Sequence, residues 1–174
     1  MHNTLQTHSN YWQCSLANAA ELNVQIANAY KREKSEATTR QTHYFAGRFE
    51  NIYIDIARLP ELSALLQQVR EVAGDILHLP PQKLRIGFWF NEMAPGQITL
   101  KHSHDDDDEL LSAVYYVSVP EKSGDLVLSD AQGKVYISPC EGNLILFKPD
   151  LPHEVEENKS DQTRLSIGIN IGET

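Results

Sequence analysis

The stretch GQITLKHSHDDDDELLSAVYYVSVP, residues 96–120, decides the fold of this chain. Its second half, LLSAVYYVSVP, is rich in apolar, β-branched and aromatic residues, which is typical of a buried strand. Its first half carries His102 and His104, two residues apart, and an extended strand presents both imidazoles on the same side. The stretch therefore predicts a sheet in which one strand ends in a pair of histidines.

Strand signals continue on both sides of this stretch. After Pro80-Pro81 the apolar residues change to a period of two, and turn signals divide the pattern, including PG at 95–96, SGD at 123–125 and EG at 141–142. The predicted strands are residues 83–93, 97–102, 111–119, 124–129, 134–137, 143–148, 152–157 and 163–171. Many short strands at this spacing favour a sandwich or a barrel.

The front of the chain is more helical. Apolar residues recur at helical spacing in residues 15–35, where Ser15 is a candidate cap, and in residues 60–79, where Pro60 suits the first turn. Between them, residues 49–57 alternate as a strand does. We expect a mainly β fold with N-terminal helices, a double-stranded β-helix (a jelly roll or cupin-like barrel). It would form a single domain over 1–174, with 1–80 as helical and strand support and 83–172 as the core.

Composition excludes several classes of protein. Of 174 residues, 41% are hydrophobic and 22% charged, which is ordinary for a globular protein, and a net charge of −9 argues against binding nucleic acid. The N-terminus lacks a basic region before an apolar one, and no run of 18 apolar residues occurs, so we expect no signal peptide and no membrane span. Cys14 and Cys140 show no CxxC spacing, and free thiols in a reducing compartment, the cytoplasm, are the simplest interpretation. The sequence predicts no oligomeric state.

His102 and His104 are candidate metal ligands, because two imidazoles on one side of a strand can take two positions on one ion. His153, in KPDLPHEV, begins another predicted strand after a proline-marked turn and is the best third ligand. The acidic run after His104 is by default a solvated loop. One of its carboxylates can still serve a cation held by imidazoles, and Asp106 stands two residues beyond His104. Glu109 closes the run.

The order of these pieces resembles the iron(II)/2-oxoglutarate-dependent oxygenases, from about Phe88 to Ile171. The similarity is greatest to small bacterial and phage oxygenases and to the prolyl-hydroxylase branch. The matching pieces are WFNEMAPG (89–96), HSH (102–104), LLSAVYYVSVP (110–120), SGDLVLSD (123–130), PCEGNLILFKPDLPHEV (139–155) and RLSIGIN (164–170). They cover about half of the chain.

The resemblance implies a role for three further residues. In that family an arginine or lysine about ten residues past the distal histidine pairs with the far carboxylate of 2-oxoglutarate, and Arg164 lies 11 residues beyond His153. Its planar fork suits a carboxylate. Ser166 and Tyr116 match the hydroxyl groups that reach the same carboxylate, and Tyr115 is expected to point the other way.

The chain departs from the family at one metal position. The family's strand ends in H-x-D/E, which gives two histidines and one carboxylate on iron. Here His104 stands at the carboxylate position, which leaves three arrangements open. The site has three histidines, or Asp106 joins it, or His104 and Asp106 form the pair with His102 behind them.

The resemblance further implies an iron(II)- and 2-oxoglutarate-dependent dioxygenase that hydroxylates a small molecule or a protein side chain. The implied cofactors are Fe(II) and 2-oxoglutarate, and ascorbate is a further candidate. The candidates for the barrel mouth are Tyr44, Phe45, Arg48, Phe49, Trp89 and Asn91.

Two other functions share the same fold. Gly96, His102, His104 and Glu109 also fit the first cupin motif, although Tyr116 stands where its last glycine belongs. A cupin would be an isomerase, a dioxygenase independent of 2-oxoglutarate, or a small-molecule sensor, with Glu109 as a ligand. The third alternative is a barrel without metal that serves as an interaction module.

Overall fold

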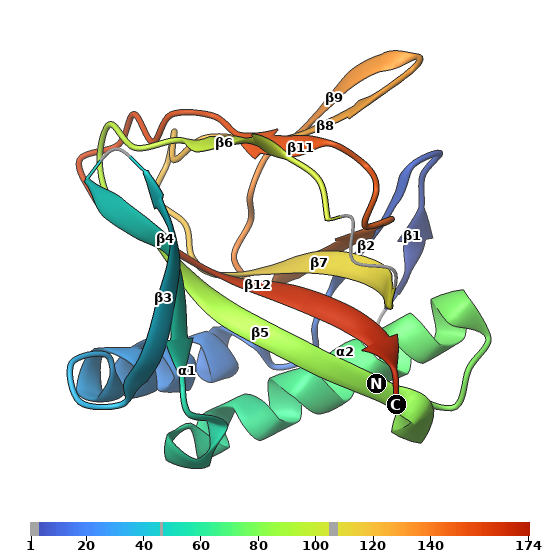
Figure 1. Cartoon of the computed structure of the whole chain (residues 1–174), viewed down its shortest axis with the longest axis horizontal. Helices are drawn as coiled ribbons and strands as arrows, with labels where there is room; N and C mark the ends of the chain where they lie inside the picture. The colour runs from blue at the N-terminus through green and yellow to red at the C-terminus, as the bar shows by residue number, and fades with distance from the viewer. Residues whose placement is uncertain (1–3, 46, 105–107) are drawn as a thin grey trace.

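The computed structural model describes residues 4–45, 47–104 and 108–174, which form two facing antiparallel sheets (Figure 1). The larger sheet has the strand order β1 (Gln6–Thr7), β2 (Tyr11–Ser15), β10 (Asn143–Phe147), β7 (Glu109–Ser118), β12 (Arg164–Glu173), β5 (Leu84–Met93), β4 (Arg48–Ile54) and β3 (Thr38–Phe45). The smaller sheet has the order β6 (Thr99–His102), β11 (His153–Val155), β8 (Leu126–Asp130) and β9 (Gly133–Ile137). This is the expected double-stranded β-helix.

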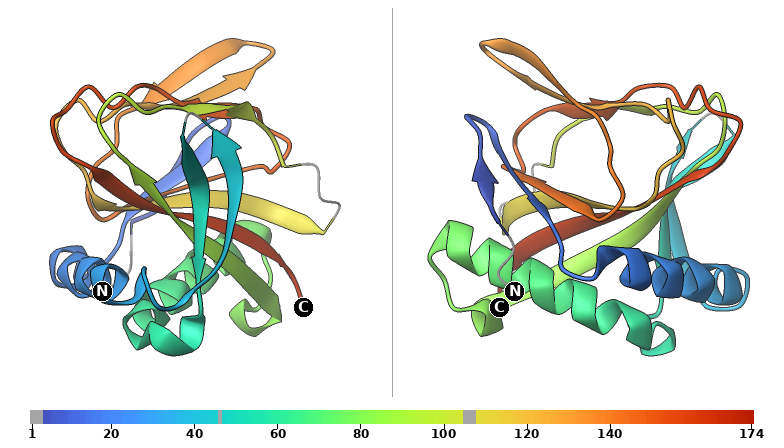
Figure 2. Two further views of the ribbon diagram at one scale, coloured as in Figure 1. Left: turned by 60° about the vertical axis from the view of Figure 1, so that its left-hand side comes forward. Right: turned by 180° about the vertical axis from the view of Figure 1, so that it is seen from behind.

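Two helices cover the outer face of the larger sheet, as both views in Figure 2 show. They are α1 (Ala19–Glu33) and α2 (Ser63–Leu77), and short 3₁₀ turns stand at Ile56–Arg58, Pro60–Leu62 and Pro81–Lys83. Their buried positions recur every three or four residues, which gives each helix one apolar face. The cap predicted at Ser15 is wrong. Ser15 pairs with Asn143 as the last residue of β2, and the helix begins after Asn18.

Every predicted strand is present, and three strands were not predicted. β1 has two residues and β2 has five, so neither repeats long enough to show a period. β3, TTRQTHYF, is polar and mostly exposed because it forms the edge of the larger sheet and is paired only with β4. Edge strands with polar residues lack the apolar alternation that identifies a strand.

The buried residues form two clusters on the two faces of the larger sheet. The first lies between that sheet and the helices, and includes Phe90, Tyr115 and Ile169. The second lies between the sheets and consists of Tyr116, Leu126, Leu128, Ile137, Ile145 and Phe147. Tyr115 and Tyr116 therefore point to opposite faces, as expected, and the Tyr115 hydroxyl donates a hydrogen bond of 2.6 Å to Asn23 Oδ1 on α1. Among the described residues, no helix is long and apolar enough to span a membrane.

Candidate metal centre

A cavity opens between the two sheets. The smaller sheet contributes His102 and His153 to its wall, and His104 lies two residues beyond the end of β6. The larger sheet contributes Arg164 and Ser166 on β12 and Tyr116 on β7. The structure thus brings together every predicted site residue except Asp106, which lies outside the described residues.

Strand register brings the three histidines to one point. β6 and β11 are antiparallel neighbours, and His153 lies directly opposite His102. The His104 backbone N–H donates a hydrogen bond of 2.9 Å to the carbonyl of Pro149, which holds the segment after β6. One ring nitrogen from each histidine lies within 4.8 Å of the other two. We call His102, His104 and His153 the imidazole cluster.

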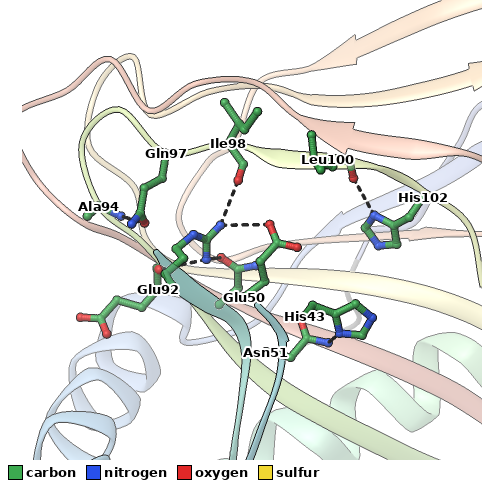
Figure 3. A network of polar contacts seen from close by, with 11 residues as sticks. His43, Glu50, Asn51, Glu92, Ala94, Gln97, Ile98, Leu100 and His102 are labelled. Carbon is green, nitrogen blue, oxygen red and sulfur yellow. Dashed lines mark hydrogen bonds and ion pairs between the residues drawn. The ribbon is translucent and has the colours of Figure 1, made fainter. Parts of the chain in front are cut away.

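Hydrogen bonds fix which ring nitrogens face the centre of the imidazole cluster. His102 Nδ1 lies 2.8 Å from the carbonyl of Leu100, and His153 Nδ1 lies 2.9 Å from the carbonyl of Leu151 (Figure 3 shows the first). A carbonyl only accepts, so both Nδ1 atoms carry hydrogen, and in the neutral form of such a ring Nε2 has the lone pair. Burial, with His102 and His104 nearby, lowers the pKa of His153 to about 3. A neutral imidazole anchored through Nδ1 is the form in which histidine binds metals.

A carboxylate stands behind the imidazole cluster. Glu109 Oε2 lies 3.9 Å from His104 Nδ1, and Glu109 Oε1 accepts a hydrogen bond from the Asn170 amide. Glu109 is not part of the group of three, and its carboxylate lies beside the His104 imidazole. Carboxylates in this position orient a ligating histidine and raise its basicity.

Arg164 is a buried cation with no acidic partner among the described residues. The residue is 2% exposed, and its Nη1 donates to the carbonyls of Ser123 (3.1 Å) and Gly124 (2.8 Å). Its Nε has no hydrogen-bond partner, and its guanidinium carbon lies 5.9 Å from the centre of the Tyr116 ring. Burial lowers the pKa of Arg164, although an arginine stays charged at neutral pH. A buried charge without a counter-ion is costly, so this cation calls for an anion in the cavity.

Two hydroxyl side chains stand beside this cation. Ser166 follows Arg164 on the same face of β12, and the register pairs it with Tyr116 on β7. Both residues line the cavity, and burial raises the pKa of Tyr116 to about 12. The Tyr116 hydroxyl therefore keeps its proton and can donate it to an anion.

The cavity also holds residues that sequence reasoning missed. Trp89 and Asn91 were expected at the barrel mouth and line the cavity, whereas Glu50 and Thr99 were not expected there. Glu50 had a signal, because it shares a face of β4 with buried Ile52. A charged residue on the apolar face of a strand points to a functional or structural partner. Thr99 carried no such signal.

The fold and the cavity define the class of jelly-roll proteins with a candidate metal centre. A family model described as the 2OG-Fe(II) oxygenase superfamily matches residues 81–172. A search of curated proteins found no match. Because the family model covers more than half of the chain, the chain belongs to the 2OG-Fe(II) oxygenase superfamily. It is therefore an oxidoreductase, a dioxygenase that uses Fe(II) and 2-oxoglutarate.

Solved structures share the fold at low identity. A prolyl-4-hydroxylase from Pseudomonas putida is 20% identical, with a TM-score of 0.65 over 95% of this chain and 88% of that one. The α-ketoglutarate-dependent epimerase SnoN from nogalamycin biosynthesis is 16% identical, with a TM-score of 0.74 over 94% and 78%. EvdO2 from Micromonospora carbonacea var. aurantiaca is 15% identical, with a TM-score of 0.69 over 99% and 94%.

Proposed function

We propose that the imidazole cluster binds the iron and that Arg164 binds the far carboxylate of 2-oxoglutarate. One observation carries this assignment. The same cavity holds three imidazoles with converging ring nitrogens and a buried guanidinium that has no acidic partner in the described part of the chain. Ser166 and Tyr116 add hydroxyl donors beside that guanidinium.

The donor set fits iron(II). Imidazole nitrogens suit iron among the divalent metals, and three protein ligands leave positions open for a co-substrate. Three neutral ligands add no negative charge at the metal. The carboxylate of Glu109, 3.9 Å from His104 Nδ1, supplies a negative charge nearby that partly balances the charge of the metal. Asp106 remains a candidate ligand, because its position lies outside the described residues.

Bound iron, with 2-oxoglutarate and O₂, supplies the oxidising power, and we propose hydroxylation as the outcome. The chain itself holds and orients the reacting groups and excludes water from them. Arg164 would hold one end of 2-oxoglutarate and leave its other end for the metal at the imidazole cluster. Leu126, Phe147 and Val155 make part of the cavity wall apolar, which keeps water from the reacting groups. The substrate is a small molecule or a protein side chain that enters this cavity.

The test compares two variants in the absence of oxygen. His153→Ala is expected to lose iron(II) binding, because one of three ligands is gone. Arg164→Ala is expected to keep iron(II) and to weaken 2-oxoglutarate binding by about a hundredfold, the cost of a buried ionic hydrogen bond. The absorption band formed by iron(II) and 2-oxoglutarate reports both.

Arg58→Ala is the control, because this exposed arginine pairs with Glu33 on the helix side of the sheet. Equal loss of iron(II) and 2-oxoglutarate in Arg164→Ala would contradict its assigned role. A full-strength band in His153→Ala would remove the imidazole cluster as the metal site.

The remaining predictions rest on fewer observations. Cys14 is a buried free thiol and Cys140 an exposed one, which supports a reducing compartment, and we propose the cytoplasm. A single domain, ascorbate as an additional cofactor and the absence of nucleic-acid and membrane partners stay predictions from the sequence.

A further inference from the structure

The cavity has a second polar region beside the imidazole cluster. It lies where β4 and β5 of the larger sheet face β6, the edge strand of the smaller sheet. Its side chains are Glu50, Trp89, Asn91 and Thr99, all of which line the cavity, and we call them the β4–β6 subsite. None of them belongs to the imidazole cluster or to the group around Arg164.

Arg48 holds the carboxylate of this subsite in place. Its Nη2 donates to Glu50 Oε1 (3.2 Å) and to the carbonyl of Ile98 (3.1 Å), and its Nη1 donates to Asn91 Oδ1 (3.4 Å). In Figure 3 the second oxygen of Glu50 points away from this bond. Glu50 is 8% exposed, so a buried acceptor is fixed in position with one oxygen left for a ligand.

Two neighbours complete a set of donors and acceptors. The Asn91 side-chain oxygen accepts a hydrogen bond from Arg48, which leaves its amide nitrogen as a donor. Thr99 is 7% exposed, and its buried hydroxyl has no hydrogen-bond partner among the described residues. A buried hydroxyl without a partner costs free energy unless a ligand supplies one. A hydroxyl group of a ligand can donate to a carboxylate and accept from an amide at once.

The charges of the subsite favour an uncharged ligand group. Glu50 already has Arg48 as its counter-ion, and both side chains are about nine-tenths buried. A second buried charge would need a counter-charge that the described residues of the subsite do not offer. Hydroxyl groups satisfy the subsite without that cost.

Trp89 gives the subsite a flat apolar floor. The indole lies across Gly168 on β12, so closely that a Cβ at Gly168 would stand 2.3 Å from the ring. The ring centre is 6.2 Å from that of His104, so the floor reaches the imidazole cluster. A flat aromatic face packs well against the C–H face of a saturated ring, as it does against other apolar surfaces.

From these contacts we infer that the β4–β6 subsite binds a neutral, hydroxylated saturated ring, such as a sugar or a cyclitol, and presents its C–H bonds to the metal. This inference rests on the proposed function, because the imidazole cluster must hold the iron for the ring to lie beside it. It names the substrate class of that same cavity.

The test uses protein loaded with iron(II) and 2-oxoglutarate. The probes are myo-inositol and the methyl glycosides of glucose, galactose and mannose, compared with the peptide Gly-Pro-Gly and with 2-naphthol. Binding without oxygen is followed by Trp89 fluorescence in a Trp12→Phe background, since the chain has 2 tryptophans. Succinate formed in air reports turnover.

At least one hydroxylated ring is expected to quench Trp89 and to raise succinate formation about tenfold. Glu50→Gln, which keeps an oxygen for Arg48, should weaken binding of that ring about tenfold or more, and Thr99→Val about fivefold. Glu154→Gln is the matched control, because this carboxylate pairs with Lys134 away from the cavity, and it should leave binding unchanged.

The subsite is wrong if no hydroxylated ring binds, if only the peptide or 2-naphthol binds, or if Glu50→Gln and Thr99→Val both bind the ring as the parent does. The iron–2-oxoglutarate absorption band in the same samples distinguishes failure of the subsite from failure of the proposed metal and co-substrate site. A normal band without ring binding removes only the subsite, whereas a missing band removes the metal and co-substrate assignment as well.

Discussion

Replacing Glu109 by glutamine should weaken iron(II) binding without removing it. The carboxylate oxygen lies 3.9 Å from His104 Nδ1, and the two side chains are 6% and 18% exposed, so solvent screens them little. A unit charge pair at that distance interacts by about 4 kcal/mol at an effective dielectric constant of 20. The imidazole carries only part of the metal's charge, so about half of this, ~2 kcal/mol or thirtyfold in affinity, is expected.

Glutamine keeps the oxygen that accepts from Asn170, so the variant removes charge and little packing. The assay is competition for Fe(II) or Co(II) against a chelator of known affinity. Asp108→Asn is the matched control, because this neighbouring carboxylate is 74% exposed and pairs with Arg85. Equal iron(II) affinity in Glu109→Gln and the parent would refute the idea that Glu109 balances the charge of the metal. An equal loss of affinity in Asp108→Asn would show a general effect of charge near the site instead of a specific role of Glu109. Asp106→Asn, measured beside them, should bind almost no metal if Asp106 is a direct ligand.

Two further substitutions and one labelling experiment test the packing of the structure. Gly168→Ala should displace the Trp89 indole, which a Cβ would approach to 2.3 Å, and should shift the tryptophan emission and destabilise the fold by about 1–3 kcal/mol in denaturant unfolding; an unchanged spectrum would contradict the contact. Tyr115→Phe should cost about 1 kcal/mol of unfolding free energy by removing a buried hydrogen bond, while 2-oxoglutarate affinity stays as it was; a fall in that affinity would place its hydroxyl in the cavity. Burial raises the pKa of Cys14 to about 11, so its reactive thiolate forms only well above neutral pH, and iodoacetamide at pH 8 should label Cys140 alone by mass spectrometry; early labelling of Cys14 would show that it is not buried.

Most of the fold could be predicted because it depends on local patterns. Period-two alternation and turn residues marked every strand of the barrel core from residue 83 onward, and helical spacing marked both helices. The strands that were not predicted adopt an extended conformation because they pair with a neighbouring strand. β2 forms because β10 offers it an edge to pair with, and Ser15 belongs to that pairing rather than to a helix cap. No local signal records such pairing.

The site residues also divide into those that the sequence indicated and those that only the fold brings together. His102 could be proposed because it shares one side of a strand with His104, and His153 because it begins a strand after a proline-marked turn. Arg164 was proposed only through the family resemblance. Glu50 and Thr99 come from two strands that never pair with one another, and they meet only because the two sheets close into a barrel. Sequence spacing carries no information about that meeting.

The position of Glu109 bears on why a histidine can replace the carboxylate of the family motif. A carboxylate bound directly to iron lowers the charge of the centre at the metal itself. In the proposed site, the charge of Glu109 would act through the His104 ring, so iron would keep more positive charge and attract the 2-oxoglutarate anion more strongly. The opposite end of that anion would meet Arg164, which has no acidic partner among the described residues. The chain would therefore hold its co-substrate tightly at both ends, and the carboxylate of an Asp side chain introduced by His104→Asp should lower 2-oxoglutarate affinity while iron stays bound. If His104→Asp binds 2-oxoglutarate as tightly as the parent in the anaerobic titration, the charge at the metal does not control that affinity, and the role of Glu109 is confined to orienting the ring.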